Sequence, residues 1–199
     1  MTMILIEQTQ VPDGALPVAE FRDHLQLGSG FADDGFQDAV LIPQLRAALA
    51  RIEGETGKVI LQRTFRYVVT AWREMAHEFL PMAPVTEILS FSVSDRSGGV
   101  EVISPGSYRL CDDTHRPQLK WLGLLLPTIP VGGKAEIVFQ AGYSANWAGV
   151  QADLKQAALV LAATFYEDRS GTRSDALPDS VSSLLKPYRQ VRLFGGGRR

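Results

Sequence analysis

Apolar residues recur at three- and four-residue steps over the first part of the chain, which is the spacing of helices that bury one face. Val18, Phe21 and Leu25 predict a short first helix, with Pro17 in its first turn and Gly28 at the position of a C-terminal glycine. The same spacing then resumes in a second, longer segment.

This second helix is predicted to begin at Asp33 and Asp34, whose carboxylates can cap free main-chain N–H groups, and to end near residues 54–57. Its buried face is expected to consist of Phe36, Val40, Leu41, Leu45, Ala48, Leu49 and Ile52. Pro43 lies inside this pattern, where it lacks an N–H group and its ring clashes with the preceding turn. We therefore expect the helix to bend or split at Pro43.

From Lys58 the apolar period changes to two, as in strands that bury one face: Phe65, Tyr67 and Val69 alternate with their neighbours. Further short strands are predicted at residues 85–94, 100–103, 108–111, 119–122 and 134–140. Two glycines within residues 95–99 can close a hairpin. The short connections leave no room for parallel crossovers, so we predict an α+β fold in which helices at both ends pack on a small antiparallel sheet.

Helical spacing returns at residues 151–168, where apolar residues cover more than half of the circumference: Leu154, Ala157, Ala158, Leu161, Ala162 and Phe165. Such a helix must be covered on two sides, and we expect the sheet on one side and another helix or a second subunit on the other. A short helix at 178–185 is predicted to stop at Pro187.

These elements predict one α+β domain over residues 1–186, followed by a basic arm at residues 187–199. Within the domain, residues 16–57 are expected to be helical, 58–142 to be rich in strands, and 151–186 to be helical.

The composition is that of an ordinary globular protein: 199 residues, 45% hydrophobic and 21% charged, which excludes collagen-like, coiled-coil and wholly disordered chains. A formal net charge of −2 gives no bulk attraction to nucleic acid or to a membrane. The most apolar stretch, residues 121–131, is too short and too interrupted by proline to span a bilayer. The single cysteine, Cys111, and the absence of a signal-like N-terminus favour a chain that stays in the cytoplasm where it is made.

Charge is distributed unevenly along the chain. Residues 1–40 carry seven acidic side chains and one arginine, whereas residues 186–199 carry five basic side chains and no acidic one. Two interpretations remain open: both ends are simply solvated, or they provide head-to-tail complementarity or docking of the basic arm on an acidic partner.

Residues able to carry chemistry are sparse. The three histidines, His24, His77 and His115, lack the spacing of a metal site, and Asp112 and Asp113 beside His115 are typical of an exposed turn. No nucleophile elbow, phosphate-binding loop or dinucleotide-binding motif occurs. We therefore predict no catalytic residue, no metal site and no cofactor. Three tryptophans are expected to anchor a core or an interface rather than to stack on bases: Trp72, Trp121 and Trp147.

The order of short motifs is more informative than any one of them. They are DD at 33–34, ETG at 55–57, QRT at 62–64, FQAGY at 139–143, DLKQA at 153–157, FYEDR at 165–169, LP at 177–178 and LLKPYR at 184–189. In this order, over residues 16–190, the chain resembles the head-tail connector, or adaptor, proteins of long-tailed phages and related gene-transfer particles.

The resemblance implies a structural virion protein, made in the bacterial cytoplasm, of which about a dozen copies form a ring beneath the portal. Such a ring continues the DNA channel, joins the DNA-filled head to the tail, and lets DNA pass without specific binding. The implied partners are the portal protein, neighbouring copies, and a stopper or other tail-side neck protein, with no membrane.

On this hypothesis the arm orders on binding to the portal, and aromatic and arginine side chains are the types that dominate interface energies. The expected portal-binding residues are Tyr188, Arg189, Arg192, Leu193, Phe194, Arg198 and Arg199. The expected interface between neighbouring copies includes Asp33, Asp34, Asp38, Val160, Phe165 and Tyr166.

Three alternatives are weighed against the adaptor. The chain could be the stopper or tail-completion protein of the same neck, or a small-molecule enzyme with an unrecognised site, which a pocket with perturbed acidic groups would reveal. A DNA-binding protein is favoured less, and salt-dependent retention on DNA would support it.

Overall fold

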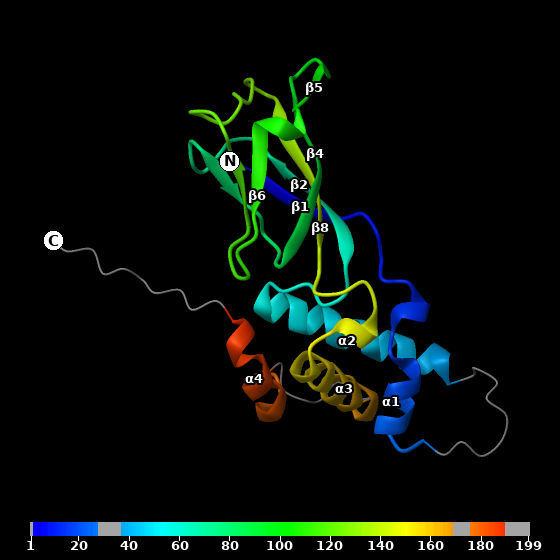
Figure 1. Ribbon diagram of the computed structural model, residues 1–199. Coiled ribbons are helices and arrows are strands. Elements are labelled where there is room, and N and C mark those ends of the chain that lie inside the picture. Colours follow the sequence, from blue (N-terminus) through cyan, green and yellow to red (C-terminus); the bar gives the residue numbers. More distant parts are fainter. Residues whose placement is uncertain (1, 28–36, 169–175, 190–199) are drawn as a thin grey trace.

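The computed structural model describes residues 2–27, 37–168 and 176–189, which form a helical layer at one end and a β unit at the other (Figure 1). The chain starts in the β unit with β1 (Met3–Glu7) and crosses to helices α1 (Val18–His24) and α2 (Asp38–Thr56). It returns to the β unit for strands β2 to β8 and finishes in the helical layer with α3 (Ala152–Glu167) and α4 (Asp179–Leu185). The predicted α+β fold is confirmed.

Two antiparallel sheets make up the β unit. The larger has the order β1-β2-β8-β4-β5, with β2 at Arg63–Val69, β8 at Lys134–Ala141, β4 at Val85–Ser94 and β5 at Val100–Val102. The smaller has the order β3-β7-β6, with β3 at His77–Phe79, β7 at Gln118–Trp121 and β6 at Tyr108–Cys111. Neighbouring strands are antiparallel throughout, as predicted from the short connections.

Side chains at every second position of the strands form the core of the β unit. In β8 every second residue is buried, from Ala135 to Ala141, and Phe139 stacks on Phe65 of β2 with ring centroids 5.8 Å apart. The hairpin between β4 and β5 is closed by Gly98 at a φ of 92°, a conformation that favours glycine. One face of the larger sheet is therefore buried, and its other face is open.

The helical layer has its own core. Along α2 the predicted apolar face is buried at Leu41, Leu45, Ala48, Leu49 and Ile52, whereas Val40, predicted for the same face, is exposed and Phe36 lies outside the described residues. The very apolar α3 contacts α1, α2 and α4 of the same chain, and α4 buries Val181 and Leu185. The helices of the same chain thus cover α3, and the expectation that the sheet covers one side of it is wrong, because the β unit has a separate core.

The end of α1 and the start of α2 differ from the predictions. α1 gives way at Leu25, and the left-handed residue after it is Gln26, with a φ of 55°, so Gly28 does not end this helix. α2 begins at Asp38 with Gln37 at its N-cap, later than the start predicted at Asp33 and Asp34. Gly28, Asp33 and Asp34 lie outside the described residues.

Pro43 does not split α2, which runs as one helix to Thr56. The proline lies just after the first turn, so its missing N–H group removes a single hydrogen bond, the one that Ala39 would accept. At the other end, Gly57 takes a φ of 67° and closes the helix, as its position predicts.

A buried network joins the helical layer to the β unit at the end of α2. Glu53 of α2 accepts a hydrogen bond from the main-chain N–H of Ile60 at 3.0 Å and pairs with the guanidinium of Arg63 on β2. The other side of that guanidinium pairs with Glu7 of β1 at 3.1 Å. Burial raises the pKa of Glu53 above its ordinary value, against the opposing effect of Arg63.

Beside this network, the segment that leaves the β unit after β8 passes close to the segment that enters it before β2. Gly142 follows β8 with a φ of 140°, and a Cβ there would lie 2.4 Å from the Cα of Gln62. Only glycine lets the outgoing strand pass the incoming one at this distance. The fully buried Lys58 donates from Nζ to the main-chain carbonyl of Thr114, and burial lowers the pKa of this amine.

Candidate interaction surfaces

The C-terminal end of the described chain is fixed to the helical layer. After α4, a short helical turn at Lys186–Tyr188 places the Tyr188 hydroxyl so that it donates to the carboxylate of Asp153 on α3, at 2.7 and 2.8 Å from its two oxygens. The Tyr188 ring also packs edge-on against Tyr143, and Arg189 pairs with Glu55 of α2 at 2.9 Å. Burial and the neighbouring Asp153 raise the pKa of Tyr188.

Two of the expected portal-binding residues, Tyr188 and Arg189, are thus engaged with the chain's own helices. We call these two residues and their partners Asp153 and Glu55 the C-terminal anchor. The other five expected residues lie outside the described part of the chain: Arg192, Leu193, Phe194, Arg198 and Arg199. Arg189, which the anchor holds, is the last described residue before these five.

Four of the acidic residues described near the N-terminus have partners within the chain. Asp38 pairs with Arg22 at 2.7 Å, Asp13 pairs with Arg46, and Glu7 pairs with Arg63. Glu20 accepts a hydrogen bond from the indole N–H of Trp147 at 2.8 Å. These contacts hold the N-terminal elements on the rest of the fold. Of the other expected interface residues, Val160, Phe165 and Tyr166 are half-buried against the helical core.

Two loops expose a group of large apolar side chains at the end of the β unit away from the helices, where Figure 1 shows the chain between β7 and β8. We call this group the apolar tip: Met75, Leu122, Leu124, Leu125 and Val131, which are 57–99% exposed. The loops are tied together by a hydrogen bond from the N–H of Leu126 to the carbonyl of Met75 at 2.8 Å, and by one from the Trp72 indole to Pro127 at 2.7 Å. Large exposed apolar patches mark contact sites, so the apolar tip is a candidate interaction surface.

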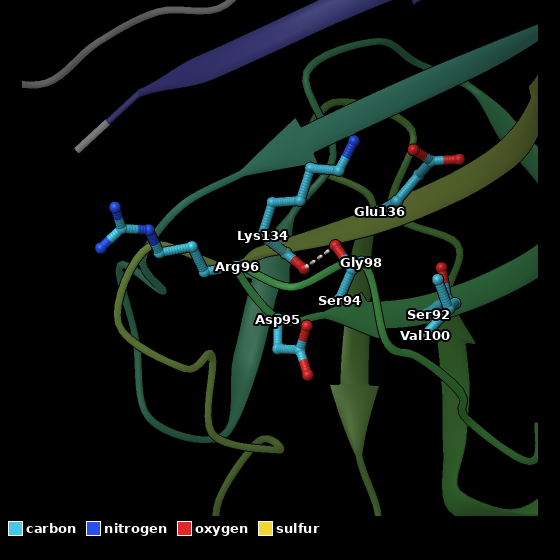
Figure 2. Close-up of a pocket in the computed structure, with 8 residues that line it drawn as sticks. All are labelled: Ser92, Ser94, Asp95, Arg96, Gly98, Val100, Lys134 and Glu136. Atoms are coloured by element: carbon cyan, nitrogen blue, oxygen red, sulfur yellow. Dashed lines mark hydrogen bonds between the residues drawn. The ribbon is translucent and has the colours of Figure 1, made fainter.

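A hollow of about 330 Å³ opens on the uncovered face of the larger sheet, beside the β4–β5 hairpin. Figure 2 shows its lining: Ser92, Ser94, Asp95, Arg96, Gly98, Val100, Lys134 and Glu136. The carboxylate of Asp95 is already used by the hairpin, since it accepts from the main-chain N–H groups of Ser97 and Gly99 and from the Ser97 hydroxyl. These bonds lower the pKa of Asp95. The hollow contains no pairing of a nucleophile with a base.

Elsewhere the polar clusters have structural roles. Asp113 accepts hydrogen bonds from the main-chain N–H groups of His115 and Arg116, both at 2.7 Å, which confirms the expected turn. Trp147 is buried, and Trp72 packs edge-on against Phe91 in the β core, as expected of anchoring residues. Within residues 2–27, 37–168 and 176–189, no three potential metal ligands come together. In the same ranges no helix has the length and apolarity needed to cross a bilayer.

No protein-family model matches the chain, and a search of curated proteins also gives no match. Solved structures do match. A chain in the neck of an empty gene transfer agent (GTA) particle, computed with C6 symmetry, is 46% identical with a TM-score of 0.89, over 97% of this chain and 98% of that one. A chain of the virion of a native GTA particle is 46% identical with a TM-score of 0.86, over the same shares of both chains. One from the neck of a native GTA particle, computed with C12 symmetry, is 42% identical with a TM-score of 0.84, also over 97% and 98%.

Proposed function

Because the chain belongs to the family of neck proteins of GTA particles, we propose that it is the adaptor of such a neck, the ring that lies beneath the portal and receives the next tail-side protein. It is a structural component of the particle neck and not an enzyme. Copies of the chain form a ring of about a dozen that continues the DNA channel, and DNA passes through without specific binding.

The observation that carries this proposal is the presence of two separate surfaces suited to two different partners. The C-terminal anchor holds the start of the basic segment on the helical layer, and the apolar tip lies at the far end of the β unit (Figure 1). A protein that joins two rings needs one binding surface for each. We assign the basic segment to the portal and the apolar tip to the tail-side neck protein.

The anchor also redefines the segment that reaches the portal. Tyr188 and Arg189 are held by Asp153 and Glu55, so the domain extends to Arg189 and the arm consists of residues 190–199. The arm carries Arg192, Leu193, Phe194, Arg198 and Arg199 with no acidic residue, which suits an acidic or aromatic groove on the partner.

The test is cosedimentation of the purified chain with the portal ring of the same particle. The full chain is compared with one that ends at Arg189, because ending the chain earlier would also remove the anchor and disturb α3. A double variant, Arg192→Ala with Phe194→Ala, tests the side chains of the arm. Arg109→Ala, an exposed arginine on β6, is the matched control for loss of one positive charge.

We expect the full chain and Arg109→Ala to bind, and the shortened chain and the double variant to lose at least tenfold in affinity, about 1.4 kcal/mol. Equal binding by the full and the shortened chain would contradict docking through the arm. Binding by neither chain would contradict the adaptor role and favour the stopper or tail-completion protein of the same neck.

A further inference from the structure

The larger sheet ends in an open edge at β1. The N–H of Gln8 bonds to Thr64 and the N–H of Thr70 bonds to Thr2, so the even-numbered residues of this segment direct their main-chain groups toward β2. Along a strand, the main-chain groups of successive residues point alternately to its two sides. The N–H and C=O groups of Met3, Leu5 and Glu7 therefore point away from the sheet. Within the described residues no main-chain hydrogen bond is formed by these outward groups.

This edge lacks the features that normally prevent pairing with another chain. β1 has the sequence MILIE, without proline, lysine or a bulge in its register with β2. Its four apolar side chains, Met3, Ile4, Leu5 and Ile6, are 37–47% exposed. An apolar edge of this kind is a template for an additional strand.

The opposite edge of the same sheet, β5, is open in the same way. Ile103 donates to Phe91, and Asp95 donates to Gly99, so the main-chain groups of Val100 and Val102 point outward from the sheet. The side chains of these two valines are 63% and 74% exposed.

Apolar side chains from both edges share one face of the sheet: Ile4 and Ile6 of β1, and Val100 and Val102 of β5. One row of opposed residues crosses the whole sheet, from Ile4 through Val68, Glu136 and Ser92 to Val102. Opposed residues share a face, and this is the open face that carries the hollow of Figure 2. A strand added beside β5 would bring its own side chains on this face against Val100 and Val102, at the rim of the hollow.

We propose that β1 of one copy pairs with β5 of the next copy, so that the larger sheets of neighbouring copies become continuous around the neck. This inference rests on the ring assembly of the proposed function. The occupant of each edge is a second copy because the two edges of one chain match each other: both expose main-chain groups, and both carry aliphatic side chains on the same face.

Strand direction supports a cyclic arrangement. Five consecutive antiparallel strands give β1 and β5 the same direction, and rotation about a ring axis preserves direction along that axis. The new pair is therefore parallel, and it joins two different surfaces of the chain, which is the heterologous contact that rings require. Pairing of β1 with β1 would instead create a two-fold dimer.

Cysteine cross-linking in purified particles tests the pairing. In a Cys111→Ser background, four double variants combine Ile4→Cys or Ile6→Cys with Val100→Cys or Val102→Cys, which samples the registers of the new pair. Particles are used because every copy lies in the neck there, whether or not it is the adaptor. The matched control combines Ile4→Cys with Val40→Cys, an exposed valine on α2.

After mild oxidation, at least one edge pair is expected to give a ladder of bands at two, three and more chain masses, while the single variants and the control give none. Particles that contain the four variants but yield no ladder would overturn the pairing, whatever the portal assay shows. Dimers from Ile4→Cys alone would overturn it in favour of β1–β1 contact. A ladder from a chain that does not bind portal rings would support the pairing and contradict only the adaptor role.

Hydrogen exchange on the unmodified chain covers the case in which the cysteine variants do not enter particles. We expect the β1 peptide to exchange at least tenfold more slowly in particles than in the monomeric chain. Equal exchange in the two states would overturn the proposal.

Discussion

Removing the guanidinium of Arg63 tests the joint between the helical layer and the β unit. Arg63→Met keeps most of the aliphatic stem but leaves Glu53 without its charged partner. The Arg63 side chain is 10% exposed and that of Glu53 is 9% exposed, so solvent cannot replace the lost interaction. The pairing with Glu7 is also lost, but that carboxylate is 38% exposed and can hydrate.

The expected loss follows from these two environments. Breaking a buried ion pair by removing one partner costs about 3–5 kcal/mol, because a charge remains buried and unpaired. The exposed Glu7 pair adds less than about 1 kcal/mol. For a chain of this size each kcal/mol lowers the midpoint of thermal unfolding by about 2–4 °C, so Arg63→Met should melt about 6–20 °C lower.

The loss of stability in Arg63→Met should also depend on pH. Burial raises the pKa of Glu53, and loss of Arg63 raises it further, so this carboxyl is neutral over a wider range in the folded variant. A folded pKa above the unfolded one means that stability falls as pH rises through the interval between them. The deficit of Arg63→Met should therefore be largest near pH 7 and shrink as pH falls toward the ordinary pKa of glutamate.

Urea unfolding of four proteins at pH 7 and pH 5 provides the measurement: wild type, Arg63→Met, Arg63→Met with Glu53→Gln, and Glu7→Gln. The double variant should recover more than half of the loss, and Glu7→Gln should lie within about 1 kcal/mol of wild type. A loss below 1 kcal/mol for Arg63→Met at pH 7, or an equal loss at both pH values, would refute the reasoning.

Four further changes follow from other parts of the structure. Burial raises the pKa of Glu78, so stability should fall as pH rises from about 4.5 through its folded pKa, and Glu78→Gln should flatten this slope in thermal melts. Tyr188→Phe removes the hydroxyl that donates to a carboxylate and should cost about 1–2 kcal/mol in urea unfolding, while an unchanged midpoint would contradict the anchor. Serine at both Leu124 and Val131 should leave the free energy of unfolding within about 0.5 kcal/mol, since both side chains are exposed, yet abolish pull-down of the tail-side neck protein. Leu5→Pro removes an outward N–H group that β2 does not use and should prevent cross-linking of neighbouring copies, whereas Leu5→Ala, which also loses the leucine side chain but keeps that N–H, should not.

The elements predicted from the sequence are those with one buried face. β4 and β6 have the predicted bounds, and the helical stripe of α3 is buried except at its C-terminal end. β1 was missed because its residues do not alternate: as an edge strand it leaves all five side chains exposed, so no period of two appears. β3 was missed because it is three residues long and its buried central residue is the polar Glu78.

The interaction surfaces were harder to predict than the elements. The partners of Tyr188 and Arg189 are Asp153 and Glu55, which lie far away in the sequence, and no local pattern links them. The apolar tip was visible as the most apolar stretch of the chain, but an apolar run in a globular protein is ordinarily buried. Only the fold shows that residues 122–125 stay outside while Leu126 turns into the core.

The last turn of α2 contributes both to the buried network that joins the helical layer to the β unit and to the C-terminal anchor. Glu53 faces Arg63 and the β unit, and Glu55, two residues later, holds Arg189 at the start of the arm. One turn of α2 thus holds both the β unit and Arg189, the last described residue before the arm. On the proposed adaptor function, this turn of α2 holds the two proposed binding surfaces, the arm and the apolar tip, in a fixed relation. The buried ion pair at Glu53, unlike an exposed one, can hold that relation because breaking it leaves a charge without solvent.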